Sequence, residues 1–408
     1  MLLESRSDTD ILNRGEGPRR LSLIVPLLKR LLAGLEAGRL TVVTPSGRRI
    51  EHRALRSGPE GVLVFHRWRA LRRLLTSGDI GFAEGYIAGE WSTPDLATLI
   101  GMLAKNSEYF ERAILGWVPL RALNRARHLL NRNSKAGSRR NIAFHYDLGN
   151  EFYQLWLDRS MTYSSALFDD LTLSLEHAQQ AKLAEIINLL QLSGGERVLE
   201  IGCGWGSLAM RLAATGARVT ALTLSARQLA YARELAQVEG VAERIDLRLE
   251  DYRNATGIFD RIVSIEMFEA VGEQYWPIYF TKLRERLKPG GKAVLQVITI
   301  ADDRFETYRQ GVDFIQRYVF PGGLLPTKDI IACHADRAGL LVAKIVPFGG
   351  SYAETLMEWR RRFKAAWPEI ARLGFPSSFR RLWEYYLAYC EAGFRTGVLD
   401  VSFYVLAG

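Results

Sequence analysis

The sequence predicts an α/β protein in which a doubly wound parallel sheet follows a smaller α+β domain. Two observations predict this fold. From residue 196 to residue 300, β-rich runs alternate with helical runs, which is the order that consecutive βαβ units produce. Over residues 131–141, the run NRNSKAGSRRN is polar, basic and poor in apolar residues, as linkers are. We therefore expect an N-terminal domain over residues 1–130, a basic linker over 131–141 and a larger domain over 142–408.

The N-terminal domain is predicted from a short series of elements. Residues 21–35 have the apolar spacing of an amphipathic helix, and residues 40–55 alternate like a strand, a turn and a second strand. The cluster Thr93-Pro94-Asp95 is a typical helix start. Residues 121–130 place basic and leucine side chains at helical spacing. This pattern fits a helix that lies on a membrane, but Pro119 shortens the helix, which favours a solvated helix that leads into the linker.

The larger domain is predicted from β-rich runs separated by helical ones. The β-rich runs are ERVLEIG, ARVTALTLS, RIDLRLED, FDRIVSIEMFE and KAVLQVITI, and helical runs such as SLAMRLAAT and SARQLAYARELAQVEG lie between them. From Thr327 onward the chain contains the aromatic helical runs MEWRRRFKAAWPEIARL and FRRLWEYYLAYCEAGF. We expect these helices to pack over the sheet and to form a lid above a ligand.

The composition is that of an ordinary globular protein, with 408 residues, 48% hydrophobic and 24% charged. No run approaches the roughly 18 apolar residues that a spanning helix needs, and the start MLLESRSDTD lacks the layout of a signal peptide. The three cysteines, Cys203, Cys333 and Cys390, do not have the paired spacing of a zinc site. We therefore expect a cytoplasmic protein without a metal site or a disulfide framework.

Positive charge is concentrated in the N-terminal third. Residues 1–141 contain 24 Lys and Arg against 13 Asp and Glu, a net charge of +11, whereas the remaining residues contain 30 against 32, a net charge of −2. Such a field attracts polyanions, and the stretch contains no nucleic-acid-binding motif. The sequence therefore favours an anionic membrane surface over nucleic acid as a partner, with the protein peripheral on the inner face of the membrane.

The loop EIGCGWG, residues 200–206, follows a β-rich run and opens a helical run. Glycine is required where the backbone turns sharply and approaches a ligand. Ser207 stands where a dinucleotide loop would have its last glycine, and no GK[ST] follows, which excludes a Walker loop. The acid and the glycines, Glu200, Gly202, Gly204 and Gly206, resemble motif I of class I methyltransferases, which bind S-adenosylmethionine (SAM). The Glu200 carboxylate suits the cationic amino group of SAM.

The ends of the second and third β-rich runs also bear on cofactor binding. After the third run, Asp251 can accept a hydrogen bond from the adenine amino group, and Tyr252 can border the ring. The second run lacks the acid that usually binds the ribose hydroxyls and has Thr223 and Leu224 instead.

Several longer runs resemble the cyclopropane-fatty-acyl-phospholipid synthase and mycolic acid cyclopropane synthase family over about residues 141–396. The runs are HYDLGNEFY, MTYSSALF, LTLSARQ, FEAVG and YVFPGG, and the segment GFAEGY with GEW looks like the smaller domain of the phospholipid-acting branch. The resemblance implies a class I methyltransferase, Rossmann-like sheet with helical lid insertions, behind a smaller N-terminal α+β domain. It also implies a homo-oligomer, which we expect to be a dimer.

The resemblance assigns a cofactor site and a reaction. By that match, the SAM site is lined by Tyr163, Ser164, Gly202, Gly204, Thr223, Leu224, Gln228, Asp251 and Tyr252. The family methylates the double bond of an unsaturated acyl chain in a membrane phospholipid and closes a cyclopropane ring with bound bicarbonate as the base. The positions that match its bicarbonate site are Ser165, Glu269, Gln296, Ile298 and Tyr352.

Two of these positions depart from the family, because Ser165 replaces a cysteine and Gln296 replaces a histidine. Both can still donate hydrogen bonds to an anion. A cyclopropane product is the first expectation, and methylation without ring closure, which gives a methylene- or methyl-branched chain, is the alternative. A non-catalytic lipid-binding protein is a third interpretation, which the intact glycine loop and Glu269 disfavour. Cys390 matches a cysteine to which the family ascribes a catalytic role, but methyl transfer needs no thiolate, which favours a buried structural cysteine.

Overall fold

The computed structural model describes residues 18–107, 109–110 and 148–408, and its larger part is built on a seven-stranded sheet. The strand order is β10-β11-β9-β8-β5-β6-β7. The strands are β5 (Arg197–Ile201), β6 (Arg218–Thr223), β7 (Ile245–Leu249), β8 (Phe259–Ile265), β9 (Leu287–Ile300), β10 (Leu341–Pro347) and β11 (Leu399–Ala407). The first five of these pair in parallel, and β10 and β11 are antiparallel. The predicted doubly wound sheet is therefore confirmed.

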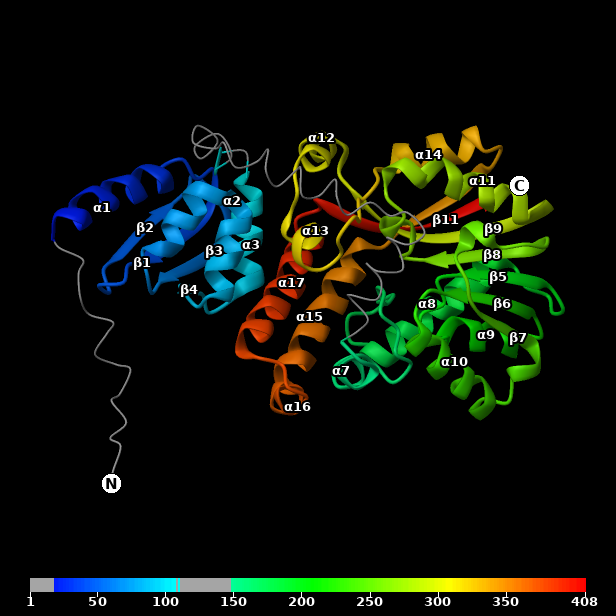
Figure 1. The fold of residues 1–408 in the computed structure, drawn as a ribbon. Helices are drawn as coiled ribbons and strands as arrows, with labels where there is room; N and C mark the ends of the chain where they lie inside the picture. The colour runs from blue at the N-terminus through cyan, green and yellow to red at the C-terminus, as the bar shows by residue number, and fades with distance from the viewer. Residues whose placement is uncertain (1–17, 108, 111–147) are drawn as a thin grey trace, which may run out of the picture.

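Helices cover both faces of this sheet, as Figure 1 shows. On one face lie α8 (Leu175–Leu190), α9 (Ser207–Ala214) and α10 (Ala226–Val238), and on the other lie α11 (Trp276–Arg286) and α14 (Lys328–Arg337). Successive side chains of β5 point to opposite faces of the sheet, since Val198 belongs to one hydrophobic core and Leu199 to the other. Because β5 has β6 on one side and β8 on the other, the chain reverses its direction of winding at β5. Ligands of such sheets bind in the crevice outside the carboxyl ends of the strands at this point.

Helical segments outside the sheet stand over that crevice. They are α7 (Asn150–Gln154), α12 (Asp302–Gln310), α13 (Phe314–Tyr318), α15 (Gly349–Ala365), α16 (Trp367–Arg372) and α17 (Ser377–Arg395). Aromatic rings join them: Phe152 contacts Trp383 of α17 with ring centroids 5.2 Å apart, and Trp156 contacts Trp359 of α15 at 5.8 Å. The predicted aromatic lid is therefore present, and its core is formed by rings that exclude water.

A smaller sheet with the order β2-β1-β3-β4 occupies the N-terminal part. Its elements are α1 (Pro18–Leu32), β1 (Ala37–Val43), β2 (Arg49–Arg53), β3 (Arg56–Phe65), α2 (Arg69–Ile87), β4 (Trp91–Ser92) and α3 (Leu96–Lys105). The predicted helix and strand pair correspond to α1, β1 and β2, and Asp95 caps α3 by accepting a hydrogen bond from the Thr98 amide. The predicted linker 131–141 and the helix predicted at 121–130 lie outside the described residues.

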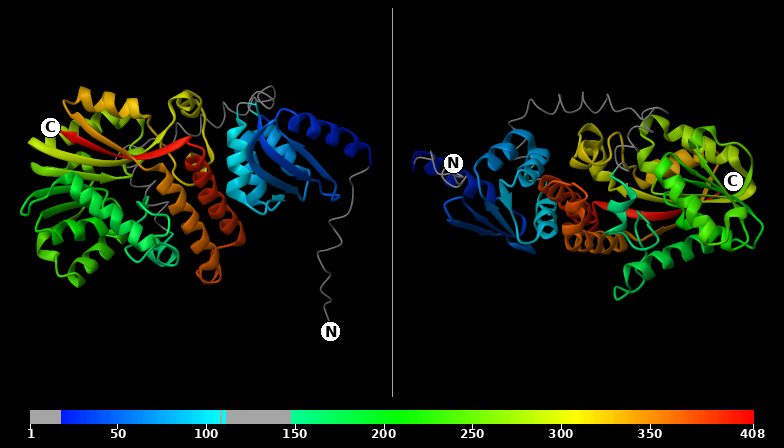
Figure 2. Two further views of the ribbon diagram at one scale, coloured as in Figure 1. Left: turned by 180° about the vertical axis from the view of Figure 1, so that it is seen from behind. Right: turned by 60° about the horizontal axis from the view of Figure 1, so that its bottom comes forward.

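The smaller domain contacts the lid, and Figure 2 shows from two further sides that the lid helices stand between the two sheets. The Tyr318 hydroxyl of α13 donates to Glu84 of α2 at 2.7 Å, and the Tyr86 hydroxyl donates to Glu384 of α17 at 3.2 Å. Helix α3 packs along α17, where a Cβ on Gly101 would meet Ala392 at 3.9 Å. The described part of the chain contains no helix that is long and apolar enough to cross a membrane.

Candidate functional site

The glycine loop after β5 turns through three left-handed residues. Gly202, Gly204 and Gly206 have φ values of 85°, 54° and 91°. A Cβ at Gly202 would lie 3.0 Å from the Met267 side chain, and one at Gly206 would lie 3.0 Å from Ala232. A Cβ at Gly204 would meet nothing within 4 Å. Packing therefore requires glycine at the two outer positions, whereas Gly204 faces open space.

That open space belongs to a cavity of about 430 Å³ between the glycine loop and the lid. Most of the site residues predicted from the sequence line it, namely Tyr163, Ser164, Glu200, Gly202, Gly204, Thr223, Leu224, Gln228, Tyr252, Glu269, Ile298, Tyr352 and Cys390. Gly206, Asp251, Ser165 and Gln296 are not among the lining residues. The fold thus brings the predicted cofactor residues and the predicted catalytic residues to one cavity.

Two buried polar groups at the loop end of the cavity have an atom without a hydrogen-bond partner among the described residues. One is Oε2 of Glu200, and burial raises the pKa of this carboxyl to about 8. The other is Nε2 of Gln228, whose Oε1 accepts a hydrogen bond from the Thr223 hydroxyl at 2.9 Å. A carboxyl that needs a cation and an amide that needs an acceptor fit the ammonium group and the hydroxyls of SAM.

Asp251 has a different partner from the predicted one. Its carboxylate binds the Arg253 guanidinium at 2.8 Å and 2.6 Å and also accepts from the Arg253 amide at 3.0 Å. Both side chains are nearly inaccessible to solvent, and the neighbours Glu250 and Tyr252 line the cavity instead. Asp251 shapes the turn after β7, and its contact with adenine stays a prediction.

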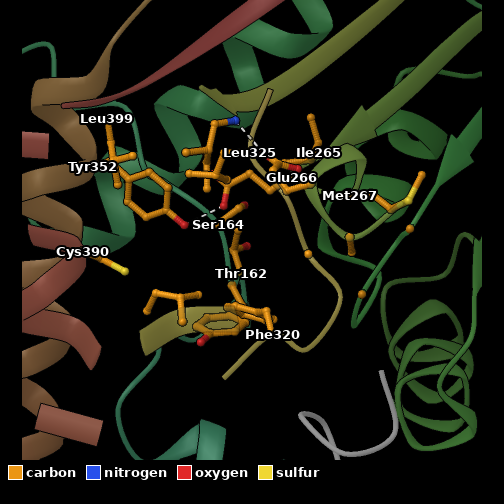
Figure 3. A pocket seen from close by; sticks show the side chains of 18 of the residues that line it. Thr162, Ser164, Ile265, Glu266, Met267, Phe320, Leu325, Tyr352, Cys390 and Leu399 are labelled. Carbon is orange, nitrogen blue, oxygen red and sulfur yellow. Dashed lines mark hydrogen bonds between the residues drawn. The ribbon is translucent and has the colours of Figure 1, made fainter. Parts of the chain in front are cut away.

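Three of the five positions predicted to hold bicarbonate donate to a protein carboxylate, that of Glu266. The Ser165 amide and Gln296 Nε2 donate to one Glu266 oxygen at 2.9 Å and 2.7 Å, and the Tyr352 hydroxyl donates to the other at 2.6 Å. Figure 3 shows the Tyr352 hydroxyl pointing at Glu266, with Met267 on the far side of Glu266 from Tyr352. The Ser165 hydroxyl donates elsewhere, to the Ala166 carbonyl.

Glu269 and Ile298, the other two predicted positions, bind each other, since the Ile298 amide donates to Glu269 Oε1 at 2.5 Å. Burial, together with the charge of Glu266, raises the pKa of Glu269 to about 8. Burial also raises the pKa of Glu266, but its three donors and the charge of Lys182 oppose this shift. Three donors reach the Glu266 carboxylate and one reaches Glu269, so hydrogen bonding favours the charged form of Glu266 more than that of Glu269.

A bound bicarbonate does not fit this arrangement. The donors that would bind it are already bound to Glu266 and Glu269, and the Glu266 carboxylate would repel a second anion at hydrogen-bonding distance. The bicarbonate site inferred from the family resemblance is therefore replaced by a carboxylate of the chain itself.

Sequence analysis missed Glu266, although the signal was present. Glu266 directly follows β8, whose neighbour in the sheet is the strand that carries the glycine loop. Its φ is 48°, and its amide donates to the Gln296 carbonyl at 2.8 Å. An acid at the carboxyl end of a strand beside the switch point is a candidate for the site on position alone.

Lys182 was also missed, because a lysine within a helical run is read as solvated. It is buried on α8 and lines the cavity, and its ammonium donates to the Ser164 hydroxyl at 2.7 Å. Burial lowers the pKa of Lys182 to about 8, and the charges of Glu266 and Asp158 oppose this shift. The lysine therefore brings a positive charge to the cavity at neutral pH and leaves the Ser164 hydroxyl hydrogen free to donate.

Cys390 lines the cavity from α17. Burial raises the pKa of its thiol far above neutrality, with a further contribution from the charge of Asp313. Cys390 is therefore a thiol and not a thiolate, which agrees with a structural role. Among the described residues, no group of His, Cys, Asp and Glu side chains is placed to hold a metal ion.

Comparisons with known proteins show the family to which the chain belongs. The family model described as mycolic acid cyclopropane synthetase matches residues 133–404. Tuberculostearic acid methyltransferase UfaA1 of Mycobacterium tuberculosis is 42% identical over 349 residues, which are 83% of this chain and 81% of the relative. Cyclopropane-fatty-acyl-phospholipid synthase of Escherichia coli is 37% identical over 79% of this chain and 82% of its own length. The crystal structure of mycolic acid cyclopropane synthase CmaA1 complexed with SAH and CTAB has a TM-score of 0.63 and 29% identity, and covers 66% of this chain and 98% of that one.

The open space at Gly204 generates a binding prediction. Gly204→Val places a branched side chain in the open space beside the loop, where we expect the cofactor, and it should abolish binding of S-adenosylhomocysteine in calorimetry. Gly204→Ala is the matched control, since it also places a side chain on the left-handed backbone, at a cost on the order of 1 kcal/mol, but adds only a methyl group. Unchanged affinity in a folded Gly204→Val variant would exclude this loop as the cofactor site.

Proposed function

Because the chain belongs to the mycolic acid cyclopropane synthetase family and is a SAM-dependent methyltransferase of lipid chains, we propose that it methylates an unsaturated acyl chain without closing a ring. The substrate is the double bond of an acyl chain in a membrane phospholipid, and the product carries a methylene branch. The observation that carries this proposal is the Glu266 carboxylate, which receives the hydrogen bonds of Ser165, Gln296 and Tyr352.

An isolated double bond is a weak nucleophile, so the cavity must position it and exclude water. Bound SAM supplies an electrophilic methyl group on its sulfonium. When one alkene carbon takes this methyl, the positive charge remains on the neighbouring chain carbon. The aromatic faces of Phe320 and Tyr386, which line the cavity, are available to stabilise that charge in a dry environment.

The product depends on when a proton leaves the new methyl group. If it leaves at once, the electrons of the C–H bond close a cyclopropane ring. If a hydride first moves from the methyl-bearing carbon to its cationic neighbour, the positive charge moves to the methyl-bearing carbon. Loss of a proton from the new methyl group then forms an exocyclic double bond. In both cases the proton must pass to a base beside the methyl group.

Glu266 favours the second outcome. Three donors stabilise its negative charge and so weaken it as a base. Its backbone is fixed at the end of β8, so it does not shift toward the methyl group as a small bound anion can. Slower proton removal leaves time for the hydride shift, and the methylene product follows.

The relatives support both the reaction and its alternative. UfaA1 is named for tuberculostearic acid, a methyl-branched fatty acid, and the Escherichia coli relative is named for a cyclopropane product. Conversion of a methylene branch into a methyl branch adds a hydride and a proton. A separate hydride-donating reaction must therefore follow if the final product is the saturated methyl-branched chain.

Attachment to an anionic membrane is the second part of the proposal. The charge of +11 over residues 1–141 supports it, and so does the turn between β2 and β3, where the fully exposed Leu55 lies between Arg53 and Arg56. An apolar side chain flanked by cations suits the surface of an anionic bilayer on the inner face of the membrane. A homodimer stays a prediction.

The product itself tests the proposed function. Purified protein is incubated with methyl-deuterated SAM and phosphatidylglycerol vesicles that carry oleoyl chains, and the fatty-acid methyl esters are examined by mass spectrometry and proton NMR. We expect a chain that has gained the labelled carbon with two of its three deuterons, and the same reaction with unlabelled SAM should give a product that shows vinylidene protons. Cyclopropane protons in the main product would contradict the absence of ring closure, and unlabelled lipid would contradict the activity.

Removal of the Glu266 carboxylate tests the proposed base. Glu266→Ala should lower kcat by about 100-fold or more, because base catalysis contributes about 10² to 10⁴. Bicarbonate or formate should then restore part of the activity by entering the space left by the side chain. The wild-type protein, tested with the same anions, is the control and should not respond. A Glu266→Ala variant that keeps full activity, or a wild-type protein that needs bicarbonate, would show that Glu266 is not the base.

Vesicle sedimentation tests membrane attachment. We expect binding to anionic vesicles at low salt and its loss at high salt, because the Debye length falls from about 10 Å at 0.1 M to about 3 Å at 1 M. Neutral vesicles are the control. Equal binding to neutral and anionic vesicles, or binding that persists at high salt, would refute an electrostatic attachment.

A further inference from the structure

The smaller domain forms part of the wall of the cavity. Ile100 and Ala104, one helical turn apart on α3, line the same cavity as the glycine loop. Ala392 of α17 and Leu399 of β11 line it beside them. The cavity therefore begins at the cofactor loop of one domain and reaches a helix of the other.

Helix α3 is held firmly in this position. Its opposite face packs on the small sheet, where a Cβ on Gly61 would lie 3.0 Å from Leu99 and 3.5 Å from Met102. At its carboxyl end, the Asn106 side chain accepts hydrogen bonds from the amides of Glu36 and Ala37 at 2.8 Å and 3.1 Å. The same side chain donates to the carbonyl of Met102 at 2.8 Å and to that of Ala37 at 3.0 Å. A helix fixed on one face and at one end acts as a wall and not as a loose cover.

The two ends of the cavity differ in polarity. Glu200, Lys182 and Glu266 bring ionisable groups to the cavity, whereas Ile100 and Ala104 of α3 and the neighbouring lining residue Leu399 bring hydrocarbon side chains. If the double bond of the acyl chain lies at Glu266, the methyl end of that acyl chain can therefore pack against the apolar side chains of α3.

From this geometry we propose that α3 sets the length of acyl chain that the enzyme accepts beyond the double bond, with Ile100 and Ala104 as the residues that meet the methyl end. This inference rests on the proposed function in one respect, namely that the substrate is an unsaturated acyl chain. It assigns to the smaller domain a role in substrate selection in addition to membrane attachment.

The experiment compares three acyl chains in one vesicle. Palmitoleoyl and oleoyl chains are identical up to the double bond and differ by two methylenes on the methyl side. Palmitoleoyl and cis-vaccenoyl chains are identical on the methyl side and differ on the carboxyl side. Phosphatidylglycerol vesicles that contain equal amounts of the three are treated with each full-length variant and SAM, and the ratios of methylated products are measured.

Ala104→Phe fills the end of the cavity and should lower the ratio of oleoyl to palmitoleoyl product by about tenfold, because each buried methylene contributes a several-fold difference. Ile100→Ala enlarges the cavity and should raise the same ratio. The ratio of cis-vaccenoyl to palmitoleoyl product should stay unchanged in both variants. Lys105→Phe is the matched control, since it adds the same ring at the adjacent, exposed position of α3.

A second measurement does not depend on turnover. Straight-chain fatty acids of increasing length are titrated by calorimetry into each variant saturated with S-adenosylhomocysteine, whose binding also shows that the variant is folded. Ala104→Phe should shift the preferred length to shorter chains and Ile100→Ala to longer ones. An unchanged length preference in both variants, or an equal change in the cis-vaccenoyl ratio, would overturn the assignment of α3. A wild-type protein that binds the chains with this length dependence but methylates none would contradict the proposed function and leave the assignment standing.

Discussion

The hydrogen bonding of the Glu266 carboxylate is the interaction on which the geometry of the site depends. Its donors come from three separate parts of the fold: Ser165 from the segment ahead of α8, Gln296 from β9 and Tyr352 from α15. A buried carboxylate that loses a donor is destabilised by about 1–3 kcal/mol or more. The sheet, the lid and the segment that enters the catalytic domain are therefore held in place around one charge.

The acidic side chains of the cavity suit a reaction whose cofactor and intermediate are positively charged. Burial raises the pKa values of Glu200 and Glu269 to about 8, so neither carboxyl is readily ionised at neutral pH without a cationic partner. We expect the ammonium group of the cofactor to be the partner of Glu200 Oε2, which has none among the described residues. In the proposed reaction, positive charge develops on the acyl chain beside Glu266, whose charged form is stabilised by three donors. Charges fixed in advance at such positions need no rearrangement during the reaction, which is why they are effective in a dry site.

The wall of the cavity is formed by three separate parts of the fold, namely the large sheet, the aromatic lid and the smaller domain. The switch point of the sheet supplies the cofactor loop, and the aromatic lid, with Trp156 and Trp359 in contact, keeps water out. The smaller domain supplies Ile100 and Ala104 at the apolar end. An enzyme that acts on a hydrocarbon chain needs a long dry wall, and this wall is assembled from both domains.

The sequence by itself determined the features that depend on neighbouring residues. The alternation of runs predicted the parallel sheet, and the glycines at 202, 204 and 206 predicted the cofactor loop, because backbone conformation and the periodicity of burial are local properties. One local prediction met another outcome, since the donors matched to a bicarbonate site bind carboxylates of the chain. Arg253 binds the carboxylate of Asp251, whose contact with adenine stays a prediction. Only the tertiary structure decided the role of Glu266, whose partners stand 101, 30 and 86 residues away in the chain, and the place of α3 in the cavity wall. The physical reason is that a hydrogen bond or a cavity wall depends on distance in space, and side chains remote in sequence come within that distance only when the sheet, the lid and the smaller domain have packed together.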